Sequence, residues 1–164
     1  MKKRYPQVPV IAGVEIPFLI TRDELLKILG EPDEIDDESE SMLWWDYKEP
    51  EATFHFDDEE GFRISQMIVY DKQYQFAGRK IIGGNKKSIL EFVRKYSNRK
   101  GRVILDGWKD PESQVIEFGD IGLELWFKKR RLAFVTLTIV EPKTAKKKNP
   151  SGFRQKKIGQ VHNE

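Results

Sequence analysis

The chain of 164 residues contains no cysteine, which excludes disulfide bonds, thiolate metal sites and a cysteine nucleophile. For the same reason we expect no lipid anchor on cysteine. Histidine is almost as scarce, and neither His55 nor His162 stands in a spacing typical of a catalytic triad or a metal cluster. The motifs of zinc proteases and of hydrolase nucleophile turns do not occur. We therefore predict no catalytic, cofactor-binding or metal-binding residues, and a protein that is not an enzyme.

Long apolar runs are also missing, because no stretch approaches the roughly 20 residues needed to span a bilayer. The N-terminus places basic residues before apolar ones, as a signal peptide does. Pro6, Pro9, Glu15 and Pro17 interrupt that apolar stretch, so it has no continuous hydrophobic region. We expect a cytoplasmic protein.

Charge is abundant and unevenly distributed. Charged residues make up 34% of the chain and hydrophobic residues 38%, which is typical of a globular domain with a highly charged surface. Residues 31–60 carry a net charge of −13, whereas residues 143–164 carry +6. Lys2, Lys3 and Arg4 add three positive charges at the start, so the remaining body has a net charge of −7. The net charge of +2 thus combines an acidic body with basic ends.

Two segments 64 residues apart share one helical pattern. Residues 21–29 and 85–93 both place apolar side chains at the i, i+3 and i+4 positions of a helix that buries one face. Thr21 begins a Ser/Thr-x-x-Glu capping box, and Asn85 is a strong N-cap. We expect the second helix to continue to about Ser97.

Each predicted helix follows a short extended segment and precedes three predicted strands, joined mainly by hairpin turns. The matching order of elements in the two halves indicates an internal repeat. The extended segments are predicted at 13–16 and 78–82, and the strands at about 41–47, 52–57, 62–70, 113–118, 122–128 and 132–140.

This order predicts an α+β fold of tandem β-α-β-β-β repeats, with antiparallel sheet and two short helices packed on one face. A single copy could bury little apolar surface, so the two copies are expected to pair into one sheet layer. We predict one domain over residues 5–141, with repeat one at about 8–76 and repeat two at about 77–141. A basic flexible tail is predicted at 142–164.

The residues of the first copy carry a resemblance to known families. Residues 21–33 read Thr-x-x-Glu-Leu-Leu-x-x-Leu-Gly-x-Pro-Asp, and an acidic loop, a strand with Trp45 and Tyr47, and a Phe-x-Phe strand follow. This pattern resembles the helix–meander domain of outer-membrane assembly lipoproteins and, in tandem over residues 13–140, the β-lactamase inhibitor protein and bacterial immunity proteins. The chain lacks the lipidated cysteine of the first group and the disulfides of the second. The resemblance implies a fold, and the habit of binding proteins through an open sheet face.

Two segments come close to ligand-binding motifs without matching them. The acidic stretch 33–41 lacks the glycine and the final glutamate of an EF-hand loop, so we interpret it as a solvated acidic loop that could steer a basic partner. Gly78 and Gly83 have the spacing of a phosphate loop, but Gly84 and Asn85 stand where Lys-Ser/Thr is required. We interpret these glycines as the turn into the second helix.

Strand alternation predicts which side chains point away from the helices. His55 in the first copy and Trp126 in the second share this outward position, and one of the adjacent Trp44 and Trp45 must also point away from the core. A sheet face with Trp, His and charged groups is typical of a protein-binding surface. These four residues are the candidate partner-binding residues. Alternatively, the N-terminal segment, the tail or a second subunit covers the face.

The favoured function is a non-enzymatic protein-binding module, of the inhibitor or immunity type, with an unknown protein partner. A second hypothesis is a nucleic-acid-associated protein, because residues 143–164 could bind nucleic acid or an anionic surface in a salt-dependent way. The same segment could instead be a mobile, solubilising extension that folds back onto the acidic loop of its own chain. A third hypothesis is a carboxylate-dependent enzyme, for which a deep pocket with a strongly perturbed Asp or Glu would be the first sign.

Overall fold

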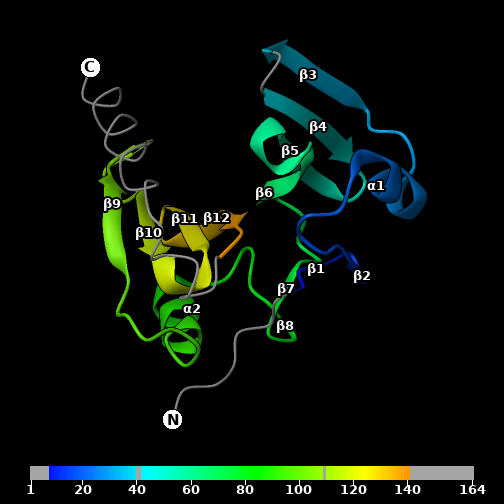
Figure 1. Ribbon diagram of the computed structural model, residues 1–164. Helices are drawn as coiled ribbons and strands as arrows, with labels where there is room; N and C mark the ends of the chain where they lie inside the picture. Colours follow the sequence, from blue (N-terminus) through cyan, green and yellow to red (C-terminus); the bar gives the residue numbers. More distant parts are fainter. Residues whose placement is uncertain (1–7, 40–41, 109, 141–164) are drawn as a thin grey trace.

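The computed structural model describes residues 8–39, 42–108 and 110–140. This part of the chain contains two α-helices and twelve strands, and all strand pairs are antiparallel (Figure 1). The predicted fold class is confirmed: tandem repeats form antiparallel sheet, and both helices pack on one face. Each repeat consists of a short hairpin, a helix and a four-stranded meander, which is two strands more than predicted.

The elements of the two repeats follow one another in the same order. Repeat one contains β1 (Val10–Ile11), β2 (Val14–Glu15), α1 (Arg22–Leu29), β3 (Glu34–Ser39), β4 (Met42–Lys48), β5 (Glu51–Asp57) and β6 (Arg63–Val69). Repeat two contains β7 (Gln75–Phe76), β8 (Arg79–Lys80), α2 (Lys86–Val93), β9 (Arg102–Asp106), β10 (Gln114–Phe118), β11 (Leu123–Lys128) and β12 (Arg131–Thr138). The second repeat begins with β7, so the predicted boundary after residue 76 falls inside its first hairpin.

The two meanders join into one eight-stranded sheet with the order β3-β4-β5-β6-β12-β11-β10-β9. Both have a register irregularity at the same place, directly after His55 in β5 and after Trp126 in β11. In the strands that follow the irregularity, β6 and β12, equivalent residues are 68 positions apart in the sequence. Ile68 therefore has Thr136 as its equivalent, and these two residues pair with each other. The repeats are therefore related by an approximate two-fold axis between these two residues.

The hairpins of the two repeats form a second, four-stranded sheet with the order β2-β1-β7-β8. Each hairpin turns through an Ala-Gly pair in which both residues have positive φ, 53° and 80° at Ala12 and Gly13, and 52° and 81° at Ala77 and Gly78. Two positive φ angles define the type I′ turn, whose twist matches that of a two-stranded ribbon. The repeated Ala-Gly turn therefore explains why both hairpins form.

The helices start as predicted, but the second ends earlier. The Thr21 N–H donates to the Glu24 carboxylate over 2.8 Å, and this hydrogen bond lowers the pKa of Glu24. Helix α2 ends at Val93 rather than near Ser97. The Ser97 hydroxyl donates to Asp120 over 2.6 Å, and the Asn98 N–H donates to the same carboxylate. The helix itself ends because the N–H groups of Lys95 and Tyr96 donate to carbonyls three residues back, those of Phe92 and Val93, which tightens the last turn.

Both edge strands of the large sheet were missed by the sequence prediction. The predicted acidic loop includes β3, and the segment between α2 and β10 includes β9. Charged side chains on an edge strand prevent it from pairing with another chain, which explains why β3 is rich in Asp and Glu. On β9 the aliphatic Val103, Ile104 and Leu105 are exposed.

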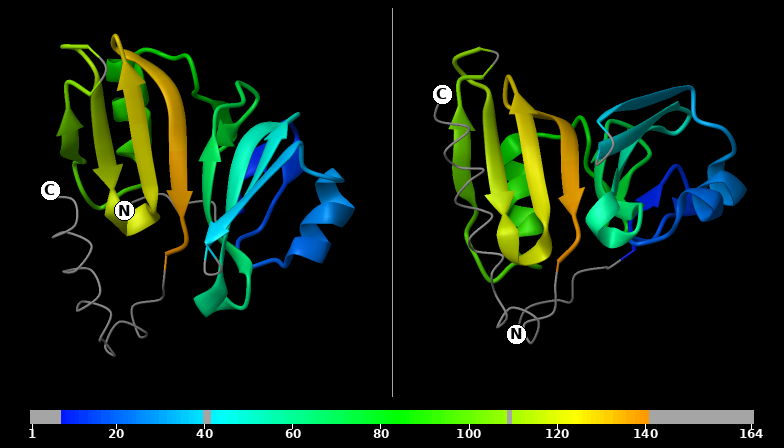
Figure 2. Two further views of the ribbon diagram at one scale, coloured as in Figure 1. Left: turned by 90° about the horizontal axis from the view of Figure 1, so that it is seen from above. Right: turned by 45° about the horizontal axis from the view of Figure 1, so that its top comes forward.

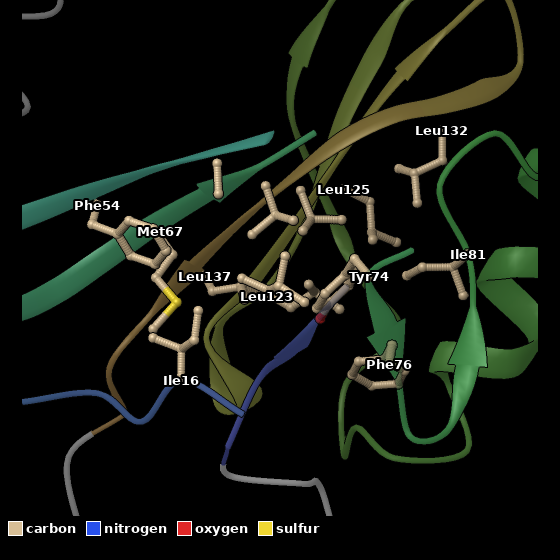
Figure 3. Close-up of a cluster of buried hydrophobic side chains, with 14 of the residues drawn as sticks. Ile16, Phe54, Met67, Tyr74, Phe76, Ile81, Leu123, Leu125, Leu132 and Leu137 are labelled. Carbon is tan, nitrogen blue, oxygen red and sulfur yellow. The ribbon is translucent and has the colours of Figure 1, made fainter. Parts of the chain in front are cut away.

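The core lies between the large sheet on one side and the helices and the small sheet on the other. Figure 3 shows Ile16, Tyr74, Phe76 and Ile81 meeting Phe54, Met67 and the leucines of β11 and β12. The large sheet bends across its middle strands, and α1, α2 and the small sheet lie on the convex side (Figures 1 and 2). The opposite face, here called the outer face, is concave and carries no helix of the described chain. None of the helices in the described residues is long and apolar enough to cross a membrane.

Candidate protein-binding face

Register places one outward side chain from each of the eight strands in a single line across the outer face, here called the middle row. It contains four carboxylates and one guanidinium, and its centre is the pair formed by Ile68 and Thr136. In strand order the residues are Glu34, Asp46, Thr53, Ile68, Thr136, Glu124, Glu117 and Arg102.

A further row lies on each side of the middle row, and the two-fold axis relates them. The Trp44 row contains Asp36, Trp44, His55, Gln66 and Thr138. The Trp126 row contains Tyr70, Phe134, Trp126, Val115 and Leu105. Equivalent positions in the two rows are occupied by Trp44 and Val115, His55 and Trp126, Gln66 and Phe134, and Thr138 and Tyr70.

Four aromatic rings meet at the Trp126 row. The rings of Trp126 and Phe134 stack with centroids 4.9 Å apart and planes inclined by 18°. Trp108, from the loop between β9 and β10, meets Trp126 edge-on at 5.4 Å, and Tyr70 contacts Phe134 at 4.8 Å. Val115 is fully buried on this face. The rings themselves are partly exposed, so they form an apolar surface that solvent reaches.

The Trp44 row has a smaller aromatic pair. The rings of Trp44 and His55 lie 4.4 Å apart, and Nδ1 of His55 is 3.3 Å from the hydroxyl of Ser65. Burial lowers the pKa of His55, and the charge of Asp57 offsets part of this effect. His55 is therefore neutral at pH 7. Its Nε2 atom is buried and has no hydrogen-bond partner within the described residues.

The carboxylates of the middle row are arranged differently in the two repeats. In repeat one the hydroxyl of Thr53 donates to Asp46. In repeat two the equivalent positions hold Glu124 and Glu117, which lie directly opposite each other, and Glu117 is paired with Arg102 at 2.7 Å.

Burial raises the pKa of Glu124, and the charge of Glu117 adds to the rise. The indole N–H of Trp126 lies near enough to offset part of it, although the pair does not reach normal hydrogen-bond geometry. Glu124 is therefore a partly buried carboxyl group beside the large aromatic ring of Trp126.

The structure separates the four predicted residues. Trp44, His55 and Trp126 lie on the outer face, whereas Trp45 is only 7% exposed and packs in the core against Phe56. Of the adjacent tryptophans, Trp44 is thus the one that points away from the core, and Trp45 is not a surface residue.

Sequence reasoning missed Tyr70, Phe134 and Trp108, which complete the aromatic surface. Alternation counted back from the core residues Val135 and Leu137 indicates an outward Phe134, but the register irregularity between Leu132 and Phe134 breaks this pattern. Tyr70 follows β6 directly, and burial raises the pKa of its phenol, with smaller contributions from the charges of Asp46 and Glu51. Nothing in the sequence placed Trp108, because its position depends on the path of a loop.

No group of three or more His, Asp or Glu residues in the described part of the chain could hold a metal ion. A hollow of about 570 Å³ lies beside α2 and is lined by Lys86, Lys87, Arg94 and Arg130 among others, so it does not include Glu124. Residues 142–164 lie outside the described residues, and their predicted contact with nucleic acid or an anionic surface stays a prediction.

Comparison with known proteins gives a fold and no family. No protein-family model matches the chain, and no curated protein matches it at a significant level. An extracellular protein containing an SCP domain from Bacillus anthracis matches with a TM-score of 0.51 and 16% identity, over 73% of this chain and 43% of that one. A DUF4309 family protein (YjgB) from Bacillus subtilis matches with a TM-score of 0.41 and 17% identity, over 73% and 78%.

The chain spans less than half the length of the first of these proteins, and at 16% identity that likeness shows shared fold alone. Neither match is a β-lactamase inhibitor protein or an outer-membrane assembly lipoprotein. The resemblance drawn from residues 13–140 therefore stays a prediction.

Proposed function

We propose that this chain is a non-enzymatic protein-binding module, of the inhibitor or immunity type, that binds its partner through the outer face. The observation that carries the proposal is the pair of aromatic groups, Trp44 with His55 and Trp126 with Phe134, on a concave sheet face that neither of the described helices covers. Partly exposed tryptophans are the side chains that most often dominate the energy of a protein interface.

The charge of the outer face indicates which side chains a partner would present. The middle row places Glu34, Asp46, Glu117 and Glu124 between the aromatic groups, and Arg102 is the basic residue at its end. A partner segment with lysine or arginine side chains could pair with these carboxylates and stack on the neighbouring indole rings. The predicted partner is therefore a protein that presents basic and apolar side chains together.

The test is capture of the partner from the native host by the full chain and by two variants, Trp44→Ala and Trp126→Ala. Loss of an interface tryptophan typically weakens binding by about 2 kcal/mol or more, which is roughly thirtyfold. We expect both variants to lose the captured protein, and Trp126→Ala to lose more because its ring belongs to the larger group.

The matched control is Ile28→Ala, which removes an exposed apolar side chain from α1 on the convex side. This variant should retain the partner. Equal capture by Trp44→Ala, Trp126→Ala and the unaltered chain would show that the outer face is not the binding site.

A further inference from the structure

The outer face and the end of the chain carry opposite charges. The three rows contain five carboxylates, from Glu34, Asp36, Asp46, Glu117 and Glu124, and one guanidinium, from Arg102. Residues 141–164 follow the described chain and carry seven basic residues: Lys143, Lys146, Lys147, Lys148, Arg154, Lys156 and Lys157. A segment of this charge is electrostatically complementary to the face.

The described chain ends just past the Trp44 row, at one end of a central strand. Strand β12 is the fifth of the eight strands, and its last residue, Thr138, pairs with Gln66 in the Trp44 row. The N–H of Ile139 still donates to the carbonyl of Ser65 over 3.2 Å. The described chain therefore ends at the Trp44 row, two strands from His55 and three strands from Trp44.

The distances allow the basic residues to reach the carboxylates. Neighbouring strands lie about 4.8 Å apart, so Glu124 is one strand and Glu34 four strands, roughly 19 Å, from β12. An extended chain covers about 3.3 Å per residue, so Lys148 can lie up to about 33 Å from Thr138. No part of the middle row is out of reach.

The described chain begins on the convex side of the large sheet. The described chain begins at residue 8, next to β1 of the small sheet, and this sheet lies on the convex side with the helices (Figure 1). Lys2, Lys3 and Arg4 would have to pass around the large sheet to reach the outer face. These three basic residues therefore serve as a control that carries the same sign of charge as the C-terminal segment.

We propose that the C-terminal segment, residues 142–164, binds across the acidic middle row of its own chain and occupies the face that Trp44 and Trp126 form. The inference rests on the proposed function in one respect: an external partner binds the same face, and the segment competes with it. Because it is tethered, the segment acts at an effective concentration in the millimolar range, and a weak contact is enough to fill the site.

The first test is carbodiimide cross-linking of the full chain at low ionic strength, which joins lysine amines to carboxylates in direct contact. Mass spectrometry should find links from lysines 143–157 to Asp46, Glu117 and Glu124 at least fivefold more often than to Asp23 and Glu91, two exposed carboxylates of the helices. Lys2 and Lys3 should show no preference for the outer face. Mixing chains of two isotopic compositions separates links within one chain from links between chains.

Similar yields for outer-face and helix carboxylates, or links only between chains, would overturn the inference. Neither result would contradict the proposed function, because partner capture by the Trp44 and Trp126 variants is measured separately. If those variants retain the partner while the cross-links form, the inference stands and the proposed function fails.

The second test measures competition in the full chain. All seven basic residues are replaced by Gln, and the affinity for a labelled peptide with the sequence of residues 143–157 is measured by fluorescence anisotropy. We expect the neutralised chain to bind the peptide at least tenfold more tightly than the unaltered chain, because its own segment no longer competes. Adding Asp46→Asn and Glu124→Gln should abolish this gain. Equal affinity for the unaltered and the neutralised chain would overturn the inference.

Discussion

The two repeats agree in their backbone and differ on one face. Leu19 and Gly83 occupy equivalent positions before the helices, and both accept a hydrogen bond at their carbonyl from an arginine, Arg63 and Arg131 respectively. Both also have positive φ, 66° and 93°. On the outer face the equivalent residues differ: His55 of repeat one corresponds to Trp126 of repeat two, and Thr53 corresponds to Glu124.

This difference shows where the sequence is constrained by folding and where it is not. Core and turn positions must satisfy the same packing twice, because the two-fold axis places equivalent strands side by side in the centre of one sheet. Outer-face residues contribute less to that packing and are free to specialise. Specialisation confined to one face is what a binding surface requires, and each prediction below either breaks or sharpens this contrast.

The largest expected effect concerns two glycines that end short 3-10 helices, Gly61 in repeat one and Gly122 in repeat two. Both have left-handed φ angles, 74° and 65°. A Cβ atom on Gly122 would lie 2.1 Å from the carbonyl oxygen of Thr138, whereas one on Gly61 would meet only the flexible end of Arg63 at 3.9 Å. Gly122→Ala should therefore cost about 3 kcal/mol or more, and Gly61→Ala about 1 kcal/mol.

Urea unfolding of both variants measures this difference as a shift in midpoint at a constant slope. Similar losses for Gly61→Ala and Gly122→Ala would show that the end of β12 does not pack on the β10–β11 turn as closely as the structure indicates.

The two aromatic groups should also differ in stability. Trp126 contacts Phe134 and Trp108, whereas the ring contact of Trp44 is to His55. Each well-oriented aromatic pair contributes about 0.5–1.5 kcal/mol beyond its buried area. Trp126→Ala should therefore lower the free energy of unfolding by about 2 kcal/mol and Trp44→Ala by about 1 kcal/mol. Equal losses in thermal or urea unfolding would mean that the larger aromatic group of the second repeat does not contribute more to stability.

Much of this contrast could be predicted from the sequence, because helix phase and strand alternation are local patterns. They placed His55 and Trp126 at equivalent outward positions, and they required one of the two adjacent tryptophans to be buried. They could not say which one, because that choice depends on the register between β4 and β5, which pairs Trp44 with His55.

The edge strands were missed for a different reason. Asp and Glu are depleted in strands generally, so the acidic residues of β3 indicated a loop. Only its position at the edge, where one side is solvated, makes them acceptable there. β9 carried a signal that was available, since three aliphatic residues lie between Gly101 and Gly107.

A smaller effect is expected from making the middle row of repeat two resemble that of repeat one. Thr53 donates to Asp46, but its equivalent Glu124 faces Glu117 with the same charge. Glu124→Thr removes this repulsion and can supply the hydroxyl donor. Directly opposed like charges cost about 0.2–1 kcal/mol, so the variant should be more stable at pH 7 by about 0.5–1 kcal/mol.

The gain has a defined pH dependence. The pKa of Glu124 is raised in the folded state, so the unfolded chain releases its proton first as the pH rises. The unaltered protein therefore loses stability as the pH rises from the ordinary glutamate value of 4.5 through the raised value. Glu124→Thr should show its advantage at pH 7 and lose most of it below pH 4.5, as measured by urea unfolding across this range. An advantage that does not change with pH would show that the like-charge pair is not its cause.

The smallest expected effect tests the type I′ turns, where the repeats are most alike. Ala12 and Ala77 both have φ angles near 50°, a left-handed conformation that asparagine adopts more readily than alanine. Ala12 is exposed, so Ala12→Asn should raise the free energy of unfolding by about 0.5 kcal/mol. Ala77 is partly buried against the core, so Ala77→Asn relieves the same backbone strain but places an amide beside apolar side chains, and its gain should be smaller or absent. A larger gain at Ala77 in thermal unfolding would show that its methyl group does not pack against the core, and that the two hairpins differ in a way the backbone does not reveal.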